Sequence, residues 1–155
     1  MADSTIATRD VENWIRKEFL PKKYHQAFAK RKLGVQSGGE FECDAVSENG
    51  GIVCFISTSS RKTISGKYGA GKFAKIRADA YWALSLKKKP QKILFAFTDK
   101  SMVELVKQEQ KNGRFPEYIE ALPVTPPIFI KKKLAKMKKK AAEEVSKQNR
   151  ESEEV

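Results

Sequence analysis

Apolar residues in the first third of the chain follow a helical spacing before the pattern changes. They recur every three or four positions from Val11 to Phe28, which is typical of an amphipathic helix. The pattern predicts a helix over residues 10–33 that kinks or restarts at Pro21 and stops at Gly34.

Strand-like patterns follow. Residues 40–47 alternate between polar and apolar side chains, and residues 52–58 form a more continuous apolar run. Asn49-Gly50 lies between them, and such a pair tolerates the positive φ angles of a tight turn. The two segments are therefore predicted to form a β-hairpin.

The rest of the pattern completes one α/β domain over residues 1–130. A central strand without alternation is expected between helices, because a strand buried on both faces is apolar throughout. We predict a mixed sheet of about four strands flanked by helices. The further elements are an amphipathic helix over 72–87, a buried strand over 92–98, a helix from a Ser101/Glu104 capping box to Gly113, and a short helix from Pro116 to Leu122.

A tail of different composition occupies residues 131–155. Residues 131–140 contain seven lysines and no acid, whereas residues 141–155 contain five glutamates against Lys147 and Arg150. Weak apolar positions at helical spacing predict a basic, then acidic, helical tail.

The balance of charged residues narrows the classes of partner that the chain is expected to bind. Thirty-one Lys and Arg residues against nineteen Asp and Glu give a formal net charge of +12, which favours a phosphate-rich partner. No apolar run approaches the length of a membrane span, and the first residues lack the pattern of a signal peptide. We therefore expect a cytoplasmic protein with no membrane partner, in which Cys43 and Cys54 are buried thiols and His25 lies on the surface.

One glycine-rich basic segment carries the strongest binding signal. No Asp or Glu occurs between Asn49 and Ala78. Hydroxyl side chains, basic side chains and the backbone amides of a helix beginning near Gly71 are the groups that contact phosphate. The predicted nucleic-acid-binding residues are Arg61, Lys62, Lys67, Lys72, Lys75 and Arg77.

Three short motifs suggest a family. Glu42-Cys43-Asp44-Ala45-Val46, Gly51-Ile52-Val53-Cys54-Phe55-Ile56 and Ser59-Ser60-Arg61-Lys62 resemble the core of the PD-(D/E)XK nuclease superfamily. The likeness covers residues 10–99 and is greatest to archaeal Holliday-junction resolvases and other restriction-endonuclease-like proteins. It implies a restriction-endonuclease-like fold, a nucleic-acid partner with DNA favoured over RNA, and pairing of two copies.

The second motif of that family is altered. The resemblance implies an acid on the first hairpin strand, matched by Asp44, and an acid-x-lysine on the second, where this chain has Ile56 and Thr58. Carboxylates hold Mg²⁺ beside the scissile phosphate in such sites. A three-residue hairpin loop would place Asp44 opposite Ile56, and a two-residue loop would place it opposite Phe55.

Two interpretations of the altered site remain open. In the first, the core binds nucleic acid and its catalytic site is degenerate. In the second, it is an Mg- or Mn-dependent endodeoxyribonuclease with a relocated site, in which Asp44 is a metal ligand and Glu42 and Lys72 are catalytic. Further candidates for that site are Glu40 on the same strand, Glu12 or Glu18 from the first helix, and Lys75 from the second.

A third interpretation is a nucleotide binder. Gly66-Lys67-Tyr68-Gly69-Ala70-Gly71-Lys72 fits the first seven positions of a P-loop. Phe73 occupies the position where a Ser or Thr would hold Mg²⁺, and no apolar strand leads directly into Gly66. Both departures disfavour this class.

Overall fold

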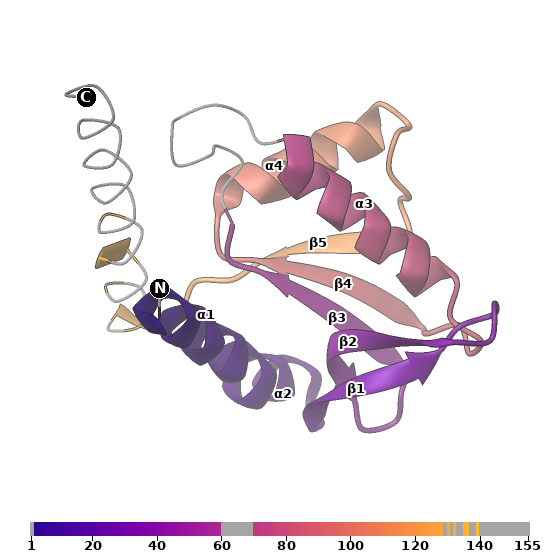
Figure 1. Ribbon diagram of the computed structural model, residues 1–155, viewed down its shortest axis with the longest axis horizontal. Coiled ribbons are helices and arrows are strands. Elements are labelled where there is room, and N and C mark those ends of the chain that lie inside the picture. Colours follow the sequence, from indigo (N-terminus) through magenta and orange to yellow (C-terminus); the bar gives the residue numbers. More distant parts are fainter. Residues whose placement is uncertain are drawn as a thin grey trace, which may run out of the picture.

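A mixed five-stranded sheet forms the centre of the fold (Figure 1), in the spatial order β1-β2-β3-β4-β5. The first three strands form an antiparallel meander, and β4 and β5 run parallel to β3. The strands are β1 (Phe28–Gly34), β2 (Glu40–Ser47), β3 (Ile52–Ser57), β4 (Lys92–Phe97) and β5 (Ile119–Pro123). The chain is thus a single α/β domain.

This computed structural model describes residues 2–59 and 70–128, and positions 130, 132, 135, 136 and 139. Helices cover both faces of the sheet (Figure 1). One face carries a continuous helical segment made of α1 (Ala2–Trp14), the π-helical turn η1 (Ile15–Phe19) and α2 (Leu20–Tyr24), and the other carries α3 (Ala70–Leu84) and α4 (Lys100–Lys111).

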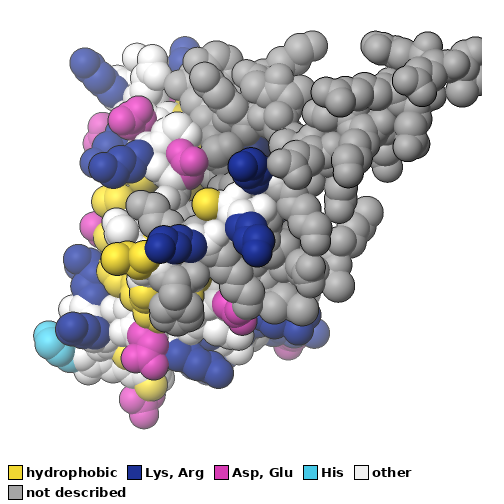
Figure 2. Space-filling model, turned by 90° about the vertical axis from the view of Figure 1, so that its left-hand side faces the viewer, with side chains coloured by type: hydrophobic (Ala, Val, Ile, Leu, Met, Phe, Trp, Pro, Cys, Tyr) yellow, Lys and Arg dark blue, Asp and Glu magenta, His cyan; other side chains and the backbone are white. Residues whose placement is uncertain are grey.

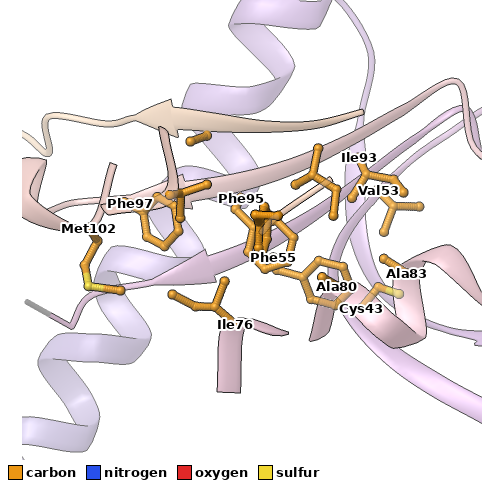
Figure 3. Packing of buried hydrophobic residues seen from close by; sticks show 14 of the residues in the cluster. Cys43, Val53, Phe55, Ile76, Ala80, Ala83, Ile93, Phe95, Phe97 and Met102 are labelled. Carbon is orange, nitrogen blue, oxygen red and sulfur yellow. The ribbon is translucent and has the colours of Figure 1, made fainter. Parts of the chain in front are cut away.

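Alternation along the central strands divides the core into two layers. Val53 and Phe55 of β3 pack in the layer under α3 and α4, whereas Cys54 and Ile56 pack in the layer next to α1. Figure 3 shows the first layer, in which Phe55 lies against Phe95 of β4 with ring centroids 5.2 Å apart. This two-sided burial explains the continuous apolar runs of β3 and β4.

The predicted helix over residues 10–33 is wrong beyond Tyr24. His25 adopts a left-handed conformation (φ 57°) that ends α2, and residues 28–34 form β1 instead. β1 is an edge strand whose Lys30, Arg31 and Lys32 are exposed. Exposed charges are common on edge strands because they hinder pairing with other chains, but they hide the alternation that identifies a strand.

The predicted short helix from Pro116 to Leu122 is also wrong, because residues 119–123 form β5. Together with β1, this raises the sheet from the predicted four strands to five. The N-cap of α4 also lies two residues before the predicted one. Its N-cap is Asp99, whose carboxylate accepts a hydrogen bond from the Ser101 amide at 2.9 Å, and not Ser101 itself.

Other expectations are confirmed. Cys43 and Cys54 are free and buried, and His25 is exposed. Burial raises the pKa of the Cys43 thiol to about 12, so this thiol stays protonated at neutral pH. In the part of the chain that the structure describes, no helix has the length and apolarity needed to cross a membrane.

The C-terminal tail is only partly described. Positions 132, 135, 136 and 139 are helical. The acidic part from residue 141 onward lies outside the described residues.

Candidate functional site

A pocket of about 370 Å³ opens where β3 ends, between α1, β2 and the first half of α3. We call it the strand-end pocket. Figure 2 shows the side of the molecule on which α1 begins and β3 ends, with Lys and Arg side chains lying among Asp and Glu side chains. The polar residues that line the pocket are Thr8, Glu12, Asp44, Ser57, Thr58, Ser59, Lys72, Lys75 and Asp79.

A β-bulge in β2 positions the first of the acids. Ala29 of β1 pairs with Val46, and Arg31 pairs with Cys43. Asp44 and Ala45 therefore oppose a single residue, Lys30. Bulges of this kind increase the local twist of a strand and redirect its side chains.

The Asp44 carboxylate also takes over part of the sheet hydrogen bonding. Paired residues are Ala45 with Cys54 and Val46 with Val53, which is the register of the two-residue loop, with Asp44 opposite Phe55. Pairing stops at Ala45, and the Ile56 amide instead donates to Asp44 Oδ2 at 2.8 Å. The strands diverge where the pocket opens, and the side chain of Asp44 connects them.

Arg16 binds the backbone of the same strand. It lies in η1, is only 9 % exposed, and donates from Nε to the Asp44 carbonyl oxygen at 2.6 Å. Its guanidinium also donates to Asn13 Oδ1 at 3.0 Å and lies 3.9 Å from Glu12 Oε2. Arg16 therefore fixes the orientation of α1 relative to the bulge.

The carboxylates of the pocket influence one another. Burial, and then the charge of Asp44, raise the pKa of Glu12, against the smaller opposing effect of Arg16. Burial raises the pKa of Asp79 as well, with Asp44 acting in the same direction and Lys75 against it. Asp44 is thus close enough to Glu12 and to Asp79 for their charges to interact, although the three residues come from different elements.

Donor groups line the pocket together with these acids. Lys72 and Lys75 come from the first two turns of α3, next to Gly71, and Ser57 and Ser59 come from the end of β3. Basic side chains, hydroxyls and a helix N-terminus are the usual ligands of phosphate groups.

Several predicted site residues lie elsewhere. Glu42 is about half exposed and lies 3.9 Å from Lys30 Nζ, outside the pocket. Arg77 lies over the Phe73 ring at 4.5 Å and 3.5 Å from Glu109. Glu18 and Glu40 are exposed and do not line the pocket, and Arg61, Lys62 and Lys67 lie outside the described residues.

Three residues of the site were not among the sequence candidates, namely Thr8, Arg16 and Asp79. The spacing of Lys75 and Asp79 is that of a helical ion pair, so Asp79 looked like an ordinary surface acid. Arg16 looked like one of many surface cations. Only the packing of α1 and α3 on the sheet brings them to the site.

The donor set does not fit a bound metal as it stands. A divalent site of the kind implied by the resemblance needs several carboxylate oxygens directed at one point. Among the described residues, no three His, Cys, Asp or Glu side chains lie in positions that could hold a metal ion. One oxygen of Asp44 is already bonded to the Ile56 amide.

Comparison of the chain with protein-family models, with curated proteins and with solved structures finds no match.

Proposed function

We propose that this chain binds nucleic acid through the phosphodiester backbone at the strand-end pocket, without cleaving it. The observation that carries the proposal is the meeting of Lys72 and Lys75 with hydroxyl side chains at one pocket, beside Asp44. These groups contact phosphates and do not read base sequence. Binding should therefore depend on salt and be insensitive to sequence.

The order of elements also supports the proposal. A helix, an antiparallel meander, a helix and a strand parallel to the third follow one another in α1, β1, β2, β3, α3 and β4. This order agrees with the nuclease-like core suggested by the residues around Asp44 and Ile56. On that likeness, DNA is the favoured ligand and a paired assembly is expected.

The absence of cleavage is proposed because the chain has an apolar residue where the nuclease-like core needs its second acid. The position that should supply the second acid is Ile56, whose side chain is buried in the layer next to α1. Asp79 lies in the pocket, where burial raises the pKa of its carboxyl group and the charge of Lys75 acts in the opposite direction. The pocket therefore lacks an acid at the position where the resemblance implies the second metal ligand.

The test measures binding and cleavage with the same DNA. A fluorescent duplex is titrated with the wild-type chain and with Lys72→Ala/Lys75→Ala at several salt concentrations. We expect the variant to bind at least tenfold more weakly, and the slope of log affinity against log salt to fall by about two. Lys107→Ala/Lys111→Ala removes two exposed charges from α4 and should change the affinity much less.

The same duplex, a single strand and a four-way junction are then incubated with Mg²⁺ or Mn²⁺. Intact DNA is the expected result. Cleavage that is lost in Asp44→Asn would instead establish the relocated nuclease, and unchanged affinity in the lysine variant would overturn the proposal as a whole.

The nucleotide-binding interpretation predicts a different outcome. Four of the seven positions of its motif, residues 66–69, lie outside the described residues. Phe73, in the metal-holding position of that motif, packs against Phe115 with ring centroids 6.0 Å apart. Binding of ATP that is lost in Lys72→Ala, without binding of DNA, would favour this alternative.

A further inference from the structure

A second hollow lies at the opposite end of α3, between the edge strand β1 and the turn that follows the helix. Its volume is about 380 Å³, and it is lined by Arg31, Leu33, Glu48, Leu86, Lys87 and Lys88, among others. We call it the turn hollow. It shares no residue with the strand-end pocket.

Backbone hydrogen bonds hold the two sides of the turn hollow together. The Lys87 amide donates to the Gly34 carbonyl at 3.0 Å, and the Gln36 amide donates to the Ser85 carbonyl at 2.8 Å. Val35 and Leu86 form a β-bridge between the same segments. Hydrogen bonds therefore fix the backbone that carries Lys87 to the end of β1.

The charges of the turn hollow are unbalanced. Arg31, Lys87 and Lys88 are exposed, and Glu48 is the acid that lines the hollow with them. Among the described residues, none of these three cations forms an ion pair, whereas Lys30 pairs with Glu42 and Arg114 with Glu109. Three cations against one acid leave a concave surface with net positive charge.

A role in preventing the edge strand β1 from pairing with another chain would explain Arg31, but not the other two cations. A basic residue on β1 hinders edge-to-edge pairing, which is sufficient for Arg31. Lys87 and Lys88 belong to no strand, yet they converge with Arg31 on the same hollow. Convergence of cations from separate segments is what recognition of an anion requires.

We propose that the turn hollow is a second phosphate contact for the same nucleic-acid molecule that is bound at the strand-end pocket. The two sites lie at the two ends of α3, which has fifteen residues and is therefore about 22 Å long. Phosphates along one strand of B-DNA advance by about 3.4 Å per residue, so one duplex reaches both sites only when it spans about six base pairs or more. This inference rests on the proposed function.

The test uses duplexes of about 4, 8, 12 and 20 base pairs with the full chain. Arg31→Ala/Lys87→Ala/Lys88→Ala should bind the shortest duplex like wild type. It should bind the longer duplexes at least tenfold more weakly, with a salt slope smaller by about two to three. Lys22→Ala/Lys107→Ala/Lys111→Ala removes the same charge from exposed positions on α2 and α4 and should retain most of the affinity.

Glycine amide signals in an NMR titration give a readout that does not depend on a variant. Gly34 and Gly50 line the turn hollow, and Gly71 lines the strand-end pocket. The 12-base-pair duplex should shift the signals of all three, while the shortest duplex shifts Gly34 and Gly50 less. Gly113, at the end of α4 and outside both linings, serves as the unshifted reference.

The outcomes separate the two proposals. Failure of the wild-type chain to bind any duplex would overturn both. Binding that depends on Lys72 and Lys75 but is equal for the turn-hollow variant and wild type would overturn only the second contact. Equal losses for the two triple variants would also overturn it, because net charge alone would then explain the effect.

Discussion

Asp44 connects two strands that have stopped pairing with each other. Its carboxylate accepts the Ile56 amide at 2.8 Å, while its carbonyl oxygen accepts the Arg16 guanidinium at 2.6 Å. A carboxylate in this position has a structural role whether or not the pocket also binds a ligand. The two roles can be separated by comparing substitutions that keep or remove the acceptor.

Asp44→Ala is expected to lower the free energy of unfolding by about 1–3 kcal/mol, because it leaves the Ile56 amide without its partner in a part-buried position. Asp44→Asn keeps an acceptor oxygen and should lose much less. Urea denaturation of both variants measures the difference. Equal losses for Ala and Asn would show that the charge, and not the hydrogen bond, stabilises the strand ends.

Glu12 should make stability depend on pH. Its folded-state pKa is raised above the ordinary 4.5, first by burial and then by Asp44. Protonated Glu12 is favoured by the folded state, so its contribution to the free energy of unfolding is complete below the unfolded-state pKa. This contribution is lost as the pH rises through the higher folded-state pKa. Relative to wild type, Glu12→Gln should therefore gain thermal stability between acidic and neutral pH.

Melting temperatures of wild type and Glu12→Gln, measured from pH 4 to pH 8, check this expectation. Glu18→Gln removes the same charge from an exposed position in η1 and controls for net charge. A difference in melting temperature that does not change with pH would contradict the raised pKa.

Only part of the site was predictable at the level of single residues. Asp44, Lys72 and Lys75 were found because a short motif and an acid-free segment marked them. Asp79 and Arg16 carry no local signal, since an acid or a cation on a helix has the same spacing whether it faces solvent or a pocket. Their roles depend on how α3 and α1 pack on the sheet.

At the scale of elements, the buried parts of the fold were more predictable than its edges. β3 and β4 are apolar on both faces, so each appears in the sequence as a continuous apolar run. The edge strands β1 and β5 lack such a pattern. β1 is exposed over four consecutive residues, and β5 has only five residues beginning three positions after Pro116.

The cap of α4 gives a direct comparison of sequence and structure. Asp99→Ala should lower the free energy of unfolding by about 1 kcal/mol, because its carboxylate accepts from both the amide and the hydroxyl of Ser101. Glu104→Ala should change it by less than about 0.5 kcal/mol, since Glu104 is exposed. Urea denaturation measures both. A larger loss of unfolding free energy for Glu104→Ala than for Asp99→Ala would instead support the capping box predicted from the sequence.

At the scale of the whole molecule, the net charge of +12 is spread over several surfaces. The structure places cations in the strand-end pocket, in the turn hollow and on α2 and α4. A high net charge by itself therefore does not locate an interface. Salt slopes of variants with equal charge are the quantity that distinguishes a contact from a background charge.

Arg61→Ala/Lys62→Ala tests the basic segment that precedes α3. If these residues contact phosphates, the variant should bind every DNA sequence more weakly and its salt slope should fall by about two. The measurement is a fluorescence titration at several salt concentrations with two unrelated sequences. An unchanged slope would remove this segment from the interface.

The π-helical turn Ile15–Phe19 has a consequence for how this protein could change over evolution. A π turn is commonly an α-helix that has gained one residue, and each residue of an α-helix rotates the side chains by about 100°. The wider π turn takes up this extra residue, so the helical segments on its two sides keep nearly the orientation that they have in a continuous α-helix. Loss of one residue within Ile15–Phe19 would therefore restore an α-helix and leave Thr8 and Glu12 beside Asp44, whereas the same loss in a regular α-helix would rotate both side chains by about 100°.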